Sequence, residues 1–354
     1  MRIGILSFDI ATGSGQSRFA VNLSRGLLIK GFNVTIFAYS CSSEDAETLR
    51  KYGIDVYAYK EKLKTIDLYR EISDSRKVFS EMLRMVRSAD KCDFYLVLND
   101  SLVGISNYKE GGKWIYLSQG DMTLLFLNQR FLDRYYPYSL LLKRRFVTQL
   151  IRHQKSVMNY DYLFANSQFT RSIMSFILNA NFTNYVYPPV DTEFFKPVIK
   201  NSEENYVLAM LRNNTEPMYQ AVQRIARAVP VKIVGNARVE GAVTLGRIPE
   251  QELVELYSNA RLTIGSSMQE YFGYSTAESF ACGTPVLAFN LGGAAEMIDN
   301  NKNGWLVETQ DEMIHRVTEI FNRGYEEGMR ENARKSSEKF SIPASTEKFL
   351  DALQ

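Results

Sequence analysis

The sequence has few of the side chains that metal and thiol chemistry require. Its 354 residues include only three cysteines, at positions 41, 92 and 282, and they follow no CxxC spacing. This odd, scattered set argues against a disulfide framework or a structural zinc site and predicts a reducing compartment. The two histidines, His153 and His315, stand in no metal-ligand or triad-like pattern, so we expect neither a bound metal nor histidine-based nucleophilic catalysis.

The sequence also lacks an excess of one charge and any long apolar run. It has 42 basic and 40 acidic residues, a net charge of +2, which gives no global attraction to nucleic acid. The apolar stretch after Met1, RIGILSF, is too short for a signal peptide or a membrane span. We therefore expect a cytoplasmic protein with no nucleic-acid partner.

Short apolar runs alternate with helical stretches along the whole chain. The first strand, residues 3–8, is followed by a glycine turn, a helix with Phe19, Leu23 and Leu27 on one face, and a strand at 34–38, which together make a βαβ unit. Further strands are expected at 94–98, 114–117, 161–165, 185–187, 206–211, 231–235, 243–246, 262–266 and 284–290. Further helices are expected at 217–228, 250–259, 275–281, 293–299 and 310–322. Such alternation predicts parallel sheets covered by helices.

Three prolines in YPPVDTEFFKP, residues 187–197, interrupt this alternation and mark a domain boundary. We predict an α/β protein with two doubly wound, Rossmann-like domains, at residues 1–190 and 191–337, and a C-terminal helix at about 338–354 that packs back on the first domain. Folds of this type bind ligands at the carboxyl ends of parallel strands, here in a cleft between the domains.

The first glycine turn, GSGQS at residues 13–17, opens a helix. Glycine lets a backbone approach a ligand closely, and helix amides can then face an anion. Arg18 stands where a dinucleotide fingerprint would have its third glycine, so an NAD site is disfavoured. A plain tight turn and a ligand-binding turn both remain open.

The second turn lies within EYFGYSTAE, residues 270–278. Gly273 precedes a helix expected to start near Ser275, where amides and hydroxyls can face a phosphate. Glu278 completes an S-x-x-E capping box with Ser275, which is a purely structural explanation for this glutamate. Glu270 lies outside the helix, and an ordinary surface glutamate is the alternative to a site residue.

Taken together, these motifs resemble the family 4 glycosyltransferases of the GT-B fold. Between Val243 and Val307 the matching elements are LGRIPEQELVELYSNA, SSMQE followed by FG, ESFACGTPV, GGAAEMI and NGWLV. In the first half they are GSG with RFAVNLSRGLLIKGFNVTIFA, LFANSQFTRS and YPPVDTEFFKP. The resemblance covers most of the chain, and the order and spacing of the motifs make it specific.

The resemblance implies a retaining, metal-independent glycosyltransferase that moves a sugar from a nucleoside-diphosphate sugar to a glycan, lipid or small-molecule acceptor, without a cofactor. The absence of an Asp-x-Asp motif fits metal independence. The E-x7-E pair would place Glu270, as the catalytic residue, at the transferred sugar and Glu278 at the ribose. Donor-binding residues implied by the resemblance are Gly15, Arg212, Gly246, Arg247, Ile248, Phe272, Gly273, Tyr274, Ser275, Thr276 and Glu278.

Two positions depart from the family pattern. Met218 stands where a lysine usually follows the arginine equivalent to Arg212, and Gln119 stands where a histidine usually follows the strand WIYL. We expect Gln119 to be a catalytic residue that acts by hydrogen-bonding a sugar hydroxyl. Unlike histidine, glutamine cannot accept a proton. These departures keep open a second hypothesis, a catalytically silent GT-B protein that binds a glycan or another partner.

Residues 134–157 combine basic residues with aromatics and leucines. This composition is typical of a helix at the surface of an anionic membrane, and equally of a solvated helix whose apolar side packs in the core. We favour the solvated helix, and peripheral membrane contact through this region stays open.

Overall fold

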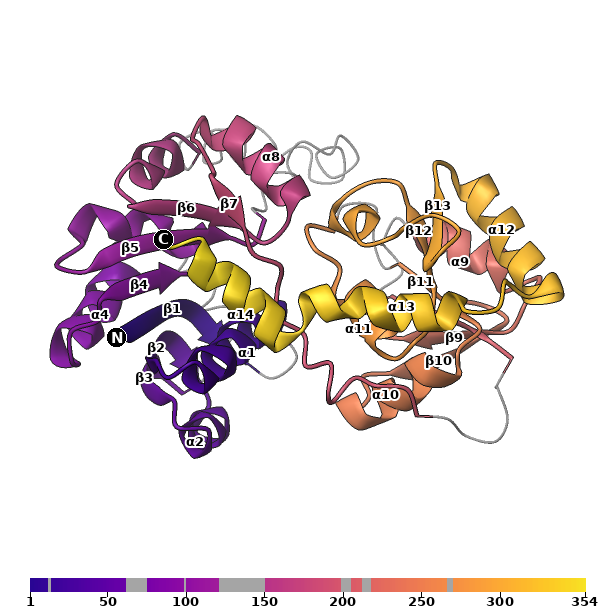
Figure 1. The fold of residues 1–354 in the computed structure, drawn as a ribbon, viewed down its shortest axis with the longest axis horizontal. Helices are drawn as coiled ribbons and strands as arrows, with labels where there is room; N and C mark the ends of the chain where they lie inside the picture. Colours follow the sequence, from indigo (N-terminus) through magenta and orange to yellow (C-terminus); the bar gives the residue numbers. More distant parts are fainter. Residues whose placement is uncertain are drawn as a thin grey trace. The chain divides into compact units, whose positions relative to one another are not determined.

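The chain folds into two compact units. In this computed structural model, one unit comprises Met1–Pro188 with Thr346–Gln354, and the other comprises Pro189–Ser345 (Figure 1). The structure describes residues 1–354 except 12–13, 62–74, 99, 121–149, 199–204, 212–217 and 266–269. We call the two parts unit 1 and unit 2.

Unit 1 contains a parallel sheet in the order β3-β2-β1-β4-β5-β6-β7. The first strand lies inside the sheet and the chain winds outward in both directions from it, which is the doubly wound topology. The strands are β1 (Arg2–Ile10), β2 (Asn33–Cys41), β3 (Asp55–Lys60), β4 (Phe94–Val97), β5 (Lys113–Ser118), β6 (Tyr162–Ala165) and β7 (Asn184–Tyr185). The helices are α1 (Gly15–Ile29), α2 (Ser43–Lys51), α4 (Ser75–Ser88), η1 (Asp100–Tyr108), α8 (Gln168–Leu178) and α14 (Ile342–Asp351).

Helices cover both faces of the unit 1 sheet. The predicted apolar face of α1, with Phe19, Leu23 and Leu27, is fully buried against one side. The C-terminal helix α14 lies on this same side, where the Phe349 ring meets Phe164 of β6 at 6.3 Å between centroids (Figure 1). Helices α4 and α8 pack on the opposite side. The sheet therefore carries a core on each face, as expected for buried parallel strands.

Unit 2 contains a second parallel sheet, in the order β10-β9-β8-β11-β12-β13. Its strands are β8 (Val207–Met210), β9 (Val231–Val234), β10 (Ala242–Gly246), β11 (Leu262–Ile264), β12 (Val286–Phe289) and β13 (Gly304–Val307). Its helices are α9 (Tyr219–Ile225), α10 (Glu250–Asn259), α11 (Tyr274–Ala281), η2 (Gly293–Glu296), α12 (Gln310–Arg323), α13 (Met329–Ser337) and η3 (Glu338–Phe340). Helices α9 and α12 lie side by side, and α11 packs against α13.

Most predicted elements of the two units are present, with two kinds of error. Helix α10 spans the predicted residues and begins directly after Pro249, whereas the helix predicted at 293–299 is only the short 3-10 turn η2. Strands β3 and β13 were not predicted. Both lie at the edge of a sheet. Many side chains of β3 are exposed, so the alternation of apolar and polar residues in its sequence is weak.

Helix residues 150–157 are the described part of the basic segment 134–157, and residues 134–149 lie outside the described ranges. His153 and Val157 are buried, whereas Arg152 and Lys155 are exposed. This part has the pattern of a helix with one packed and one solvated face. In the part of the chain that the structure describes, no helix combines the length and the apolarity needed to cross a membrane.

Two arginines of helix α13 donate hydrogen bonds to several loops of unit 2. Arg334 donates hydrogen bonds to the backbone carbonyls of Thr192, Phe195 and Ala281, at 2.7–3.0 Å. Arg330 donates to the carbonyls of Ala260 (3.0 Å) and Ser258, to the Thr284 hydroxyl (2.9 Å) and to the Tyr325 hydroxyl (3.2 Å). The guanidinium therefore satisfies several acceptors at once.

Arg330→Met should destabilise unit 2 although methionine retains the apolar stem. Removing the guanidinium leaves two carbonyls and two hydroxyls without this donor, and we expect a loss of about 3 kcal/mol in the free energy of unfolding. Urea denaturation measures this loss. Arg323→Met is the control, since Arg323 is 80% exposed in its ion pair with Glu319 and should change stability by less than about 0.5 kcal/mol. Equal effects of the two substitutions would contradict the role given to Arg330.

Candidate functional site

The motif EYFGYSTAE forms a loop and a helix beyond the carboxyl end of β11. Phe272 is buried, and Gly273 is the N-cap of α11 with φ +103°, a left-handed conformation that favours glycine. Every residue of α11 from Ser275 onward is buried. The helix therefore starts at a fixed place on the carboxyl edge of the sheet.

A glycine pair after β12 fixes the loop in front of α11. The Gly293 amide donates a hydrogen bond to the Glu270 carbonyl at 2.7 Å. A Cβ atom on Gly292 would lie 2.6 Å from the Glu270 carbonyl oxygen, and one on Gly293 would overlap the Tyr271 carbonyl oxygen. Only glycine fits at these two positions, so the backbone of 270–271 is held by direct backbone contact.

Two polar side chains lie around Gly273. The Glu270 Oε2 atom is 3.3 Å, and the Thr276 Oγ1 atom 3.5 Å, from the point where a Cβ on Gly273 would stand. Thr276 is fully buried, and its hydroxyl has no hydrogen-bond partner within the described ranges. Buried polar atoms almost always have a partner, so an unpaired hydroxyl beside a helix N-terminus is suited to a polar or anionic ligand.

Glu278 has a different role from the predicted cap. It is 3% exposed and accepts a hydrogen bond from the Tyr257 hydroxyl of α10 at 3.2 Å. The capping-box prediction is wrong, because the N-cap is Gly273 and no side chain caps the helix. Ser275 is thus already inside the helix, and Glu278 is too far along it to reach the cap amide. No local pattern around Glu278 indicates Tyr257 as its partner.

The remaining predicted residues of unit 2 lie apart from this cluster. Gly246 ends β10 with φ +72°, Arg247 is exposed and Ile248 is partly buried, all at the carboxyl edge of the same sheet. Arg212 falls outside the described residues. Met218 is buried in the core beside α9, so this position supplies no positive charge.

Two predicted residues belong to unit 1, at the carboxyl edge of its sheet. Gly15 is the first residue of α1, directly after the turn that follows β1. In that turn the Ala11 amide donates to the Ser17 hydroxyl at 2.9 Å. Gln119 directly follows β5, and its Nε2 atom is buried.

The cysteines are unsuited to nucleophilic chemistry. All three are free and buried. Burial raises the pKa of the Cys282 thiol to about 12 and the pKa values of Cys41 and Cys92 to about 11. The thiolate, which is the reactive form, is therefore scarce at neutral pH.

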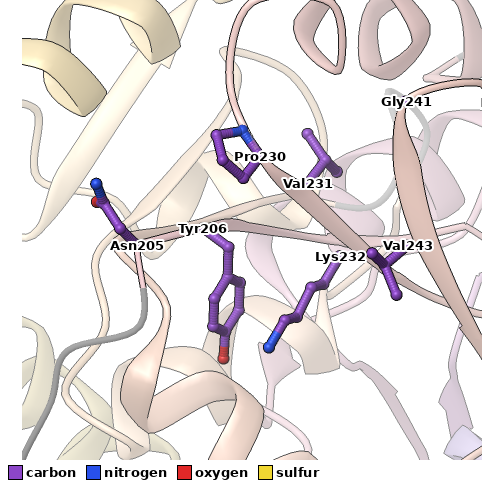
Figure 2. Close-up of a pocket in the computed structure, with 7 residues that line it drawn as sticks. All are labelled: Asn205, Tyr206, Pro230, Val231, Lys232, Gly241 and Val243. Carbon is purple, nitrogen blue, oxygen red and sulfur yellow. The ribbon is translucent and has the colours of Figure 1, made fainter.

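An opening of about 310 Å³ lies at the other end of the unit 2 sheet (Figure 2). It is bordered by residues at the amino ends of β8, β9 and β10, and the Lys232 ammonium stands 4.0 Å from the centroid of the Tyr206 ring. These amino ends of the strands lie on the opposite edge of the sheet from the carboxyl ends, near which Glu270 and Gly246 lie. We assign it no ligand.

Comparison with known proteins gives a family match within unit 2. Residues 236–339, which contain Glu270, Gly293 and α11, match the family described as Glycosyl transferases group 1. A probable sucrose-phosphate synthase from Thermosipho melanesiensis is 30% identical over 109 residues, covering 30% of this chain and 26% of that protein. The chain thus matches about a quarter or less of the length of its curated relatives.

Solved structures match over the whole chain. A sucrose-phosphate synthase from Thermosynechococcus elongatus has a TM-score of 0.80 at 14% identity, covering 100% of this chain and 98% of that one. HepE from Anabaena, in complex with UDP, has a TM-score of 0.72 at 15% identity, covering 100% and 99%. With the two parallel sheets, this confirms the predicted fold class, two Rossmann-like domains of the GT-B type.

Gly293→Ala should displace the loop that carries Glu270. The added methyl group would overlap the Tyr271 carbonyl, and we expect a loss of about 3 kcal/mol in the free energy of unfolding. The control is Gly324→Ala, where φ is +80° but no atom lies within 4 Å of the new Cβ, and about 1 kcal/mol is expected. Denaturant unfolding of both variants gives the comparison. If Gly293→Ala costs no more than the control, the loop is not held by this contact.

Proposed function

We propose that the protein is a retaining, metal-independent glycosyltransferase that moves a sugar from a nucleoside-diphosphate sugar to a glycan, lipid or small-molecule acceptor. The observation that carries this proposal is the grouping of the Glu270 carboxylate and the unpaired Thr276 hydroxyl around Gly273 at the start of α11. This grouping lies within the segment that matches the glycosyltransferase family. No cofactor takes part in the proposed reaction.

The start of α11 would bind the diphosphate of the donor. Negative charge grows on the diphosphate as the bond to the sugar breaks, and fixed dipoles stabilise that charge without reorganisation. The amides of Tyr274, Ser275 and Thr276 belong to the first turn of the helix, where the helix dipole favours an anion. The Thr276 amide also donates to the Gly273 carbonyl at 3.1 Å. Phe272 and Gly273 would present backbone groups to the sugar.

Glu270 and Glu278 would bind the two ends of the donor. We assign the Glu270 carboxylate, which is partly exposed beside Gly273, to the hydroxyls of the transferred sugar. Glu278, buried and oriented by Tyr257, would accept hydrogen bonds from the ribose hydroxyls. A carboxylate held in this way is a strong acceptor for a pair of neighbouring hydroxyls.

Further predicted residues are proposed to bind the base and the rest of the diphosphate. Gly246, Arg247 and Ile248 are the proposed base-binding residues, and Gly15 and Arg212 the proposed further contacts of the diphosphate. Because Met218 is buried and uncharged, α11 and Arg212 would supply most of the positive potential. The solved structures of HepE contain UDP and UDP-glucose, which makes uridine nucleotides the first donors to test.

We also propose a cytoplasmic location, with peripheral membrane contact through residues 134–157 if the acceptor is a lipid. The alternative function is a catalytically silent protein that binds a glycan or partner. Met218 and Gln119, in the places of the usual lysine and histidine, favour it. A panel of UDP, GDP and ADP sugars separates the two functions, because a silent protein would neither hydrolyse them nor gain thermal stability from them.

Glu270→Gln should abolish turnover and preserve the fold. The amide keeps the size of the side chain but loses the charge that would interact with the cationic sugar, so the rate of nucleotide release from the best donor should fall at least about 100-fold. The melting temperature and the affinity for the nucleoside diphosphate should stay unchanged. Glu240→Gln, at an exposed site, is the control and should keep the wild-type rate. A near-normal rate for Glu270→Gln would remove Glu270 from the mechanism.

A further inference from the structure

Two residues with amide side chains follow neighbouring strands at the carboxyl edge of the unit 1 sheet. Gln119 follows β5 and Asn166 follows β6, and these strands are paired with Ser118 opposite Ala165. The Asn166 amide donates to the Ser118 carbonyl at 2.9 Å, and its side-chain Nδ2 donates to the Gln119 carbonyl at 3.1 Å. Asn166 is therefore held against the backbone of the neighbouring strand end.

Each of the two side chains carries one buried polar atom without a partner in the described part of the chain. These atoms are Oδ1 of Asn166, whose side chain is 4% exposed, and Nε2 of Gln119. The bond from Nδ2 to the Gln119 carbonyl fixes the orientation of the Asn166 amide, so Oδ1 faces away from that carbonyl. The pair thus presents one unused acceptor and one unused donor, and leaving both buried and unpaired costs stability.

The polar residue next to this pair has its partners. Ser167 caps α8 by accepting from the Thr170 amide at 3.0 Å, and its hydroxyl donates to the Thr170 hydroxyl at 2.9 Å. The N-terminus of α8 and the ladder to β5 hold the backbone of Asn166 from both sides. The unused atoms therefore occupy a rigid position, as a site that orients a ligand requires.

We propose that Gln119 and Asn166 form a binding site for a saccharide hydroxyl. A hydroxyl is the one common substrate group that both donates and accepts, so it can accept from Gln119 Nε2 and donate to Asn166 Oδ1. The assignment rests on the proposed function, and the hydroxyl belongs either to the transferred sugar or to the acceptor. The amides orient this hydroxyl and move no proton, because neither amide titrates.

Gln119→Met tests the site with a variant that keeps the shape of the side chain. Because it removes a buried donor that has no partner among the described residues, the melting temperature should stay the same or rise. The rate of nucleotide release from the best donor, measured with and without added acceptor saccharides, should fall about tenfold or more. The control is Gln154→Met, which removes the bond from Gln154 Nε2 to the Ile177 carbonyl at 3.0 Å. That variant should melt at a lower temperature and keep the wild-type rate.

Calorimetry distinguishes the two sources of the hydroxyl. With UDP-glucose, or the sugar donor that binds best, the variant should bind at least about fivefold more weakly and bind the nucleoside diphosphate normally if the hydroxyl belongs to the transferred sugar. Unchanged affinity for both ligands, with a rate that falls only when an acceptor saccharide is present, assigns the hydroxyl to the acceptor. Asn166→Ala should give the same pattern of ligand affinities and rate, and Gln119→Met still tests the site if that variant unfolds.

A Gln119→Met variant with wild-type affinities, and with wild-type rates both with and without an acceptor saccharide, would overturn the site while leaving the proposed function intact. So would a lowered melting temperature with an unchanged rate, which is the result that a structural role predicts. A wild-type protein that neither binds nor turns over any nucleotide sugar would overturn the proposed function and this site together.

Discussion

The contact between the Gly292–Gly293 turn and the backbone of residues 270–271 is the constraint on which the site in unit 2 depends. It joins the loop after β11 to the turn after β12 through the Gly293 amide, and the two backbones are too close for any side chain. With that loop fixed, Gly273 adopts its left-handed conformation and α11 begins at one place. The positions of the Glu270 carboxylate and the Thr276 hydroxyl follow from it.

Much of the fold could be predicted from local patterns, because short stretches of sequence are enough to indicate parallel strands and amphipathic helices. Phe19, Leu23 and Leu27 are buried as their spacing required, and α10 begins where Pro249 placed it. The edge strands β3 and β13 were missed because a strand with one neighbour needs fewer apolar residues. The helix predicted at 293–299 is only a short 3-10 turn, because the backbone contact with the loop at residue 270 decides the conformation there.

The site was less predictable, because its chemistry depends on partners far away in sequence. Glu278 fits a capping box locally, but its partner is Tyr257 on another helix. Asn166 is unremarkable in sequence, and its significance lies in the bond to the Gln119 carbonyl and in the Oδ1 atom left unpaired. Among the described residues, each unit thus has buried polar atoms without a hydrogen-bond partner at the carboxyl edge of its sheet, and such atoms cost stability.

The central claim is that the buried Glu278 recognises the ribose of a nucleoside diphosphate. Calorimetric titration with UDP and with 2′-deoxy-UDP, and with the matching GDP and ADP pairs, tests it most directly. The wild type should bind the ribonucleotide about tenfold or more tightly than its deoxy form. In Glu278→Gln, where the Tyr257 hydroxyl can still donate to the amide oxygen, the difference should shrink to less than about twofold. Equal affinity of the wild type for both forms, or undiminished discrimination by the variant, would contradict the claim.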